Sequence, residues 1–123
     1  MITYVDLDDI VGKTFIDVSV DSADDALIFR HDDGSAFVFS HSQECCENVY
    51  IKQVDGDLAD LVGTPIVNAT ETVSDCVDDD ISFDEQRWTF YNFRTIKGSV
   101  TVQWYGTSNG YYSMGVDIKF VKE

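Results

Sequence analysis

The feature of this sequence that most constrains its fold is an internal repeat. Three segments of the first half recur in the same order in the second half, sharing five of ten, five of ten and four of six positions. They are residues 6–15 with 57–66, 29–38 with 93–102, and 49–54 with 116–121. Matches in a conserved order are typical of a duplicated structural unit. The sequence therefore predicts one domain, residues 1–123, built from two copies of one motif, residues 6–54 and 57–121.

Each copy begins with a predicted helical turn. Asp6 or Asp57 is placed to cap the turn, and Gly12 or Gly63 to end it in a left-handed backbone conformation. Apolar residues at helical spacing are predicted to face the core, and they are Leu7, Ile10 and Val11 in the first copy and Leu58, Leu61 and Val62 in the second.

Four antiparallel strands are predicted to follow the turn in each copy, because Val, Ile, Thr and aromatic residues gather in short runs bounded by turn residues. The expected strands are residues 14–20, 26–31, 36–40 and 49–54, and then 66–73, 88–95, 99–105 and 116–121. Asp33-Gly34 and Lys97-Gly98 are predicted to supply the positive φ that hairpin turns need. We expect a mainly β fold, with the two copies packed as a pseudo-twofold β-sandwich or barrel. An acidic insertion at about residues 74–86 is predicted to form a solvated loop.

The chain is strongly acidic, since 23 Asp and Glu residues oppose 8 Lys and Arg residues for a formal net charge of −15. Such a charge repels nucleic acid and anionic membranes, so we expect direct binding to neither. It attracts basic protein surfaces, including those that normally hold DNA, and the run Asp78, Asp79 and Asp80 is a candidate contact for such a partner. The alternative is that the acidity serves solubility or adaptation to a salty host.

The cellular location is predicted to be the cytoplasm of the host cell, because no basic and apolar leader and no membrane-length apolar run is visible. The cysteines agree with this location. Cys45, Cys46 and Cys76 are odd in number and two of them are adjacent, which is a poor basis for a disulfide framework. All three are expected to be reduced.

The predicted loop at residues 41–48 is the candidate site for metal or thiol chemistry. Its potential ligands are His41, Cys45, Cys46 and Glu47, but structural zinc sites use spaced pairs of ligands, and adjacent cysteines do not match that pattern. A Cys–His nucleophile is conceivable there. The acidic surroundings disfavour a thiolate, so no catalytic residue is assigned.

The equivalent loop of the second copy, residues 106–113, combines aromatic and small polar residues that suit a binding surface. With the preceding strand it supplies the candidate ligand contacts Trp104, Tyr105, Ser108, Asn109, Tyr111 and Tyr112. The alternative is that these residues form core and a tyrosine-rich turn. On the neighbouring strand, alternation places Trp88 with Phe90 on one face and Tyr91 with Phe93 on the other.

Arg30 and Arg94 occupy equivalent positions of the repeat. If they converged near the pseudo-axis, they would hold an anionic ligand such as a nucleotide. The alternative is that each arginine pairs with surface aspartates.

Three stretches carry a resemblance to a known family. They are residues 41–50 with Cys45-Cys46-Glu47, residues 56–66, and residues 104–113 with Ser108-Asn109-Gly110-Tyr111-Tyr112-Ser113. They resemble a family of small uncharacterised phage and prophage proteins, known as a domain of unknown function. The resemblance covers the chain from about Gly12 onward, apart from the acidic insertion. It implies a viral or mobile-element origin and assigns no activity and no catalytic residue.

The sequence therefore favours a non-catalytic acidic protein of phage origin that inhibits or redirects a host protein, with a possible role as a DNA mimic or against host defence. One alternative is a protein that binds or sequesters a small nucleotide-like molecule. A further alternative is a metal- or thiol-dependent enzyme. No cofactor is predicted, and the oligomeric state stays open.

Overall fold

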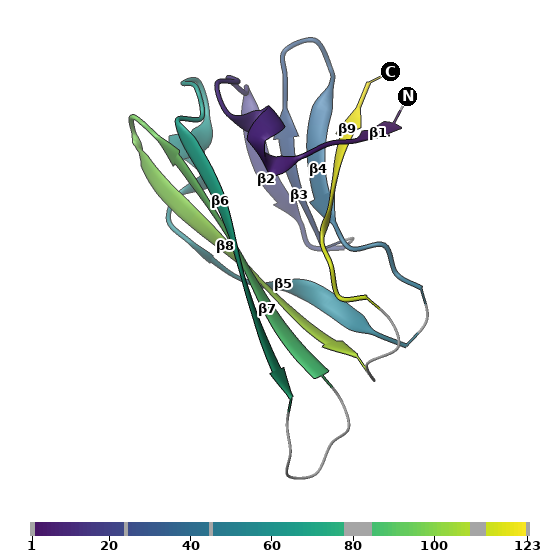
Figure 1. Cartoon of the computed structure of the whole chain (residues 1–123). Helices are drawn as coiled ribbons and strands as arrows, with labels where there is room; N and C mark the ends of the chain where they lie inside the picture. The colour runs from purple at the N-terminus through teal and green to yellow at the C-terminus, as the bar shows by residue number, and fades with distance from the viewer. Residues whose placement is uncertain (1, 24, 45, 78–84, 109–112, 123) are drawn as a thin grey trace.

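Two antiparallel β-sheets form the computed structural model of this chain (Figure 1). The structure describes residues 2–23, 25–44, 46–77, 85–108 and 113–122, and the side chains of 75–77 are not among those described. The strands are β1 (Ile2–Tyr4), β2 (Asp17–Asp21), β3 (Ala26–Arg30), β4 (Ala36–Ser40), β5 (Asn48–Asp55), β6 (Asn68–Val77), β7 (Glu85–Thr95), β8 (Gly98–Ser108) and β9 (Asp117–Val121). The mainly β prediction is confirmed. In the described part of the chain, no helix is long and apolar enough to cross a membrane.

The order of strands shows an exchange between the two halves of the chain. One sheet runs β1-β9-β4-β3-β2 and the other runs β5-β8-β7-β6, and the two do not close into a barrel. The last strand of each half therefore leaves its own sheet: β5 pairs with β8, and β9 pairs with β4. Apart from β1, the order 9-4-3-2 corresponds position by position to 5-8-7-6.

Reciprocal backbone hydrogen bonds join the segments that precede β2 and β6. The Gly12 N–H donates to the Ile66 carbonyl at 2.7 Å, and the Gly63 N–H donates to the Phe15 carbonyl at 2.9 Å. Each half thus satisfies a turn of the other, and the same pair of bonds appears when the two halves are interchanged. Next to them, two further equivalent bonds of 2.8 Å run from Ile16 to Arg30 and from Val67 to Arg94.

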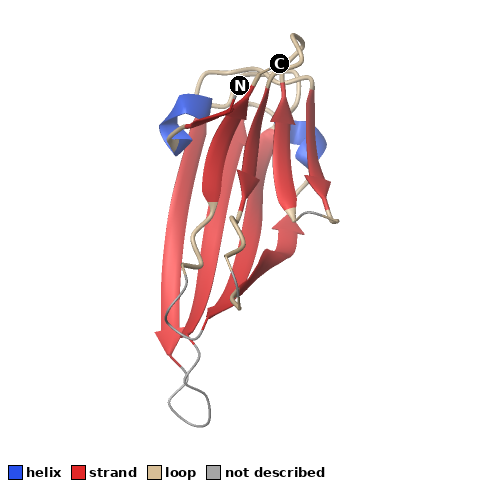
Figure 2. Ribbon diagram, turned by 90° about the vertical axis from the view of Figure 1, so that its right-hand side faces the viewer, coloured by secondary structure: helices blue, strands red, loops and turns tan. Residues whose placement is uncertain are grey.

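The two predicted helical turns are short 3-10 helices, η1 (Leu7–Ile10) and η2 (Leu58–Leu61), which lie on the two sides of one end of the molecule (Figure 2). The first has a capping box in which the Asp6 N–H donates to Asp9 Oδ2 at 2.9 Å. In the second, Asp57 Oδ1 accepts from the Ala59 N–H at 3.0 Å. The glycines that end them, Gly12 and Gly63, have φ values of 87° and 83°, as predicted.

Aromatic rings from both sheets meet in the core. Phe29 and Phe39 of the five-stranded sheet approach Phe93 at ring-centroid distances of 4.9 and 5.5 Å, and Phe39 approaches Tyr91 at 5.1 Å. The two sheets therefore face each other, which fits the sandwich alternative. As alternation predicted, Tyr91 and Phe93 share one face of β7, and that face is the core.

Local expectations fail at three places. Val11 is 39% exposed, because the 3-10 helix ends before it and Val11 continues in extended conformation. Gly98 is not among the described residues with positive φ. A Cβ there would lie 2.9 Å from Asp60 Oδ2, so a larger residue would have to displace that side chain. The acidic insertion is not simply a loop, because residues 74–77 and 85–86 lengthen β6 and β7, while residues 78–84 lie outside the described residues.

Candidate binding site between the edges of the two sheets

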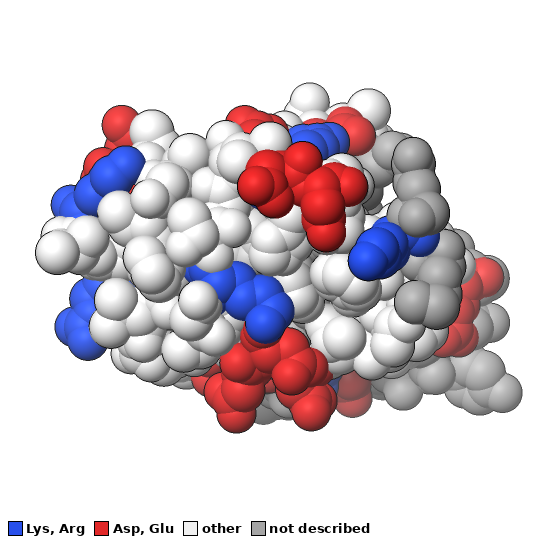
Figure 3. Space-filling view, turned by 90° about the horizontal axis from the view of Figure 1, so that it is seen from above, with Lys and Arg blue, Asp and Glu red and all other residues white. Residues whose placement is uncertain are grey.

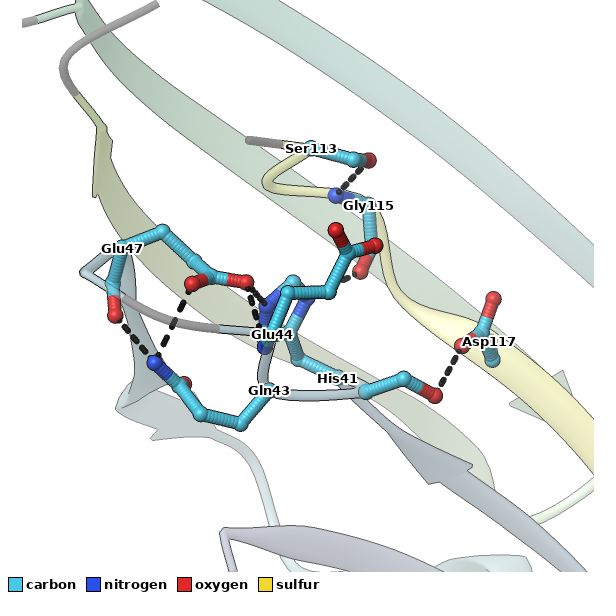
Figure 4. Close-up of polar contacts among 8 residues, drawn as sticks. His41, Gln43, Glu44, Glu47, Ser113, Gly115 and Asp117 are labelled. Atoms are coloured by element: carbon cyan, nitrogen blue, oxygen red, sulfur yellow. Dashed lines mark hydrogen bonds and ion pairs between the residues drawn. The ribbon is translucent and has the colours of Figure 1, made fainter. Parts of the chain in front are cut away.

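The two loops that the repeat singled out lie side by side, because each connects one sheet to the other. His41 and Ser42 follow β4, and Gly115 and Asp117 lie where the chain enters β9. His41 Nδ1 lies 2.7 Å from the Gly115 carbonyl oxygen, and Ser42 Oγ donates to Asp117 Oδ2 at 2.6 Å (Figure 4). These contacts fasten the β4–β5 connection to the start of β9.

A buried histidine–glutamate pair holds the first of these loops together. His41 Nε2 lies 2.8 Å from Glu47 Oε2, with the two side chains 6% and 0% exposed. The Glu44 N–H donates to the same carboxylate at 3.0 Å, and the Gln43 side chain donates to Glu47 Oε1 at 3.2 Å (Figure 4). A buried carboxylate is tolerable when it collects several donors in this way. The arrangement therefore organises the loop and exposes neither side chain to a substrate.

The same contacts bear on the predicted metal ligands. Both ring nitrogens of His41 face protein acceptors, so a metal ion would have to displace one of these hydrogen bonds. Within the described ranges, no group of three or more His, Cys, Asp and Glu side chains could hold a metal ion. Cys45 lies outside the described residues, so metal binding by the loop stays an alternative and not the prediction.

Cys46 is disulfide-bonded, so the expectation that all three cysteines are reduced is wrong for this residue. An odd number of cysteines prevents complete pairing, but it leaves one pair available. The count alone therefore could not exclude a single bond.

A cleft opens beside Asp117, between the edge strands β1 and β6 of the two sheets. Its volume is about 390 Å³, within the range of ligand-binding pockets. The walls come from the N-terminal segment, from β6, and from the chain leading into and along β9. They comprise Tyr4, Val5, Asp6, Leu7, Glu71, Val116, Asp117 and Ile118.

The electrostatics of the cleft are negative. Asp6, Glu71 and Asp117 supply three carboxylates from segments far apart in the sequence. Tyr91 lies directly opposite Glu71 in the β6–β7 register and is fully buried. Burial raises the pKa of Tyr91 well above its ordinary value, and the nearby Glu71 carboxylate and the charge of Asp117 raise it further. The phenol therefore stays neutral, and its hydroxyl makes no hydrogen bond of normal geometry within the described part of the protein.

The two arginines do not converge. Phe29 and Phe93 point into the core, so Arg30 and Arg94, one residue further along each strand, lie on the outer faces of different sheets. Arg30 is exposed and pairs with Asp17 at 3.1 Å. Neither arginine lines the cleft.

The predicted aromatic site divides between core and surface. Trp104 is buried in the core at 1% exposure, and Ser108 is also buried. Tyr105 lies on the outer face of the four-stranded sheet, in a row with Tyr50 and Trp88 at centroid distances of 5.8 and 4.4 Å. The remaining predicted contacts lie outside the described residues, and they are Asn109, Tyr111, Tyr112, Asp78, Asp79 and Asp80.

Sequence reasoning missed the cleft. One signal was present in the predicted strand 66–73, where Glu71 alternates with the buried Ala69 and so points to the core face. A charged residue at such a position indicates either an edge strand or a binding site.

Comparison with known proteins gives a family and no activity. A family model described as a domain of unknown function, DUF7448, matches residues 8–118, so the chain belongs to that family. No curated protein and no solved structure matches the chain.

Proposed function

We propose that this DUF7448 protein is a non-catalytic binding protein that uses its acidic surface to hold a basic surface of another protein. The observation that carries the proposal is the net charge of −15. Every described Asp and Glu side chain except Glu47 is at least partly exposed. Surface charge of one sign steers and orients partners of the opposite sign.

The grouping of the acidic side chains on one face favours a partner with spaced basic side chains over a groove that holds duplex DNA. On the face seen in Figure 3, carboxylates form separate groups with neutral and basic surface between them. A mimic of duplex DNA needs a more continuous stripe of charge, because DNA carries a charge about every 1.7 Å along its axis. Separate groups suit a surface that presents lysine and arginine side chains at intervals.

The non-catalytic part of the proposal is supported by the state of the titratable groups. His41 and Glu47 are buried and bonded to each other, and Cys46 is in a disulfide. These groups are therefore not presented as a base or a nucleophile.

The class of partner is taken from the resemblance to phage and prophage proteins. A protein of that origin acts in the host cell, and we propose that it inhibits or redirects a host protein there. The nucleotide-binding alternative has less support, because the arginines lie apart and the cleft is acidic.

We also infer that the chain arose by duplication of one strand–exchange unit. The reciprocal hydrogen bonds of Gly12 and Gly63 and the matching strand orders support this inference. One register differs from the sequence match: Phe29 pairs with Phe37 and Phe93 with Val100, so Phe37 corresponds to Val100 and not to Thr101.

Affinity capture with charge-matched variants tests the function. The immobilised chain is exposed to host extract at low and high salt, beside a cleft variant (Glu71→Gln with Asp117→Asn) and a control variant (Asp32→Asn with Glu85→Gln). We expect a basic protein that the wild type and the control retain, that salt releases, and that the cleft variant retains poorly. If none of the three proteins retains a basic protein, or if salt does not release it, the proposal is contradicted. Equal loss in both variants would place the contact on the acidic surface outside the cleft.

A further inference from the structure

We propose that the cleft between β1, β6 and β9 is a binding site for an organic cation, a primary ammonium or guanidinium group on an alkyl stem. The inference deepens the proposed function by naming the chemical group that the acidic surface receives. It rests on that function only for the identity of the partner, because the site itself is argued from the cleft's own residues.

The arrangement of the carboxylates selects an extended cation. Asp6, Glu71 and Asp117 line one cleft, yet in the part of the chain that is described they do not form a metal-binding group. They are therefore spread around the cleft and do not converge on a point. A bare metal ion needs convergent oxygens, whereas an ammonium group with several donors can reach carboxylates on different walls.

A buried polar group points to a ligand independently of the carboxylates. The Tyr91 hydroxyl is fully buried, has no hydrogen bond of normal geometry among the described residues, and lies near the carboxylates of Glu71 and Asp117, both of which line the cleft. Leaving a buried hydroxyl without a partner costs stability, so such a group needs an explanation. A cationic donor that reached between Glu71 and Asp117 would approach this oxygen from the cleft.

The other half of the molecule shows what this position holds where there is no cleft. Counting from the equivalent residues Asp17 and Asn68, Val20 corresponds to Glu71, and Leu27 opposite it corresponds to Tyr91. The first half thus places a Val–Leu pair where the second half has a Glu–Tyr pair. The Val–Leu pair shows that the fold is satisfied by apolar side chains at these positions. We therefore infer that the Glu–Tyr pair serves binding.

The rest of the cleft suits the stem of such a ligand. Val5, Leu7, Val116 and Ile118 give it apolar walls, and all four also pack against the core. Lys119 Nζ lies 5.8 Å from the centre of the ring of Tyr4, which also lines the cleft. This ring therefore already contacts an alkylammonium group of the protein itself.

The ligand has two sources, a free polyamine or a lysine or arginine side chain of a partner protein. Calorimetric titration of the full chain with spermidine and with a short lysine-rich peptide distinguishes them. Hexaamminecobalt(III), which is trivalent like spermidine but has no alkyl stem, measures unspecific attraction to the acidic surface. Tighter binding of spermidine assigns a free amine, and tighter binding of the peptide assigns a side chain.

The variants locate the site. We expect the Glu71→Gln, Asp117→Asn variant to bind the preferred probe at least about tenfold more weakly, because each lost charge-assisted hydrogen bond is worth about that factor. The Asp32→Asn, Glu85→Gln control loses the same charge and should change affinity by less than about threefold, since its carboxylates are distant and screened. Equal weakening in both, or equal binding of the cobalt complex to the wild type, would overturn the proposal. Binding of spermidine without any host partner would contradict only the proposed function.

Tyr91→Phe separates a binding role from a structural one. It removes the unpartnered hydroxyl and keeps the ring in the core. We expect weaker binding of the preferred probe together with a melting temperature that is unchanged or higher. A lower melting temperature with unchanged affinity would show that the hydroxyl serves the fold.

Discussion

Apart from β1, the two halves of this molecule have the same elements in the same order, yet their cores are filled differently. Phe15 of the first half lies among rings, 5.1 Å from Phe29 and 5.9 Å from Phe37. The equivalent residue of the second half is Ile66, which is equally buried. Both backbones accept the same reciprocal hydrogen bond from the opposite turn. Turn glycines and strand exchange therefore define the architecture, and the core tolerates different side chains within it.

The halves differ most where the repeat is broken. Strand β1 has no counterpart in the four-stranded sheet, and the chain passes from it through Val5 into η1. In the second half, β5 leads into η2 through Gly56, which has a φ of 112°. The backbone of Gly56 passes so close to Ser99 that a Cβ would lie 2.7 Å from the Ser99 carbonyl oxygen. The acidic cleft lies beside β1. It therefore lies at a place where the two halves of the chain are not equivalent.

The largest expected effect tests whether the anchors of the two halves are equivalent. Phe15→Ala should lower the free energy of unfolding by about 3–5 kcal/mol and Ile66→Ala by about 2–5 kcal/mol, because each leaves a cavity under the opposite turn. Urea denaturation followed by tryptophan fluorescence measures both. If either substitution lowers the free energy of unfolding by less than about 1 kcal/mol, the two buried residues do not have equivalent roles in the two halves.

The second prediction restores apolar character at the position where the halves differ. Glu71→Val with Tyr91→Phe removes the carboxylate and the buried hydroxyl, as in the Val20–Leu27 pair. We expect the free energy of unfolding to rise by about 1–2 kcal/mol, mainly because the unpartnered hydroxyl is gone. Urea denaturation of this variant and of Glu71→Val alone apportions the gain. A destabilised double variant would mean that the polar pair belongs to the fold.

The sequence predicted much of this architecture because local chemistry decides it. The glycines after the two helical turns and the Asp33-Gly34 turn each determine a backbone conformation. The alternation around Tyr91 and Phe93 determines which face of the strand is buried. The match of Phe37 to Thr101 slipped by one residue because the two hairpin loops differ in length, which an ungapped comparison cannot show. The helical segments were too short to distinguish a 3-10 helix from an α-helix.

The candidate site was harder to predict for a different reason. The cleft takes Asp6, Glu71 and Asp117 from three distant segments, and only strand exchange brings β6 near β9. Arg30 and Arg94 are equivalent in sequence, but equivalence across two facing sheets places them on opposite outer faces. Sequence symmetry therefore indicates related positions without showing whether those positions meet.

The smallest expected effect concerns the two hairpin turns. In the first, the Ser35 hydroxyl donates to Asp33 Oδ1 at 2.6 Å and the Ser35 N–H donates to the same oxygen at 2.9 Å. These bonds lower the pKa of Asp33. The shorter second turn, Ile96-Lys97, has no carboxylate, and Lys97 Nζ donates to the Val62 carbonyl at 2.7 Å.

Because the pKa of Asp33 is lower in the folded than in the unfolded state, its contribution to stability is present above the unfolded pKa. That contribution is lost as the pH falls through the folded pKa. Asp33→Asn keeps an acceptor for Ser35 and removes the titration, so its stability should decline slightly less steeply in acid than that of the wild type. Urea midpoints measured from about pH 6 to about pH 3 give the difference between the two curves. Since all the other carboxylates are common to both proteins, parallel curves would show that the first turn is no more sensitive to acid than the second.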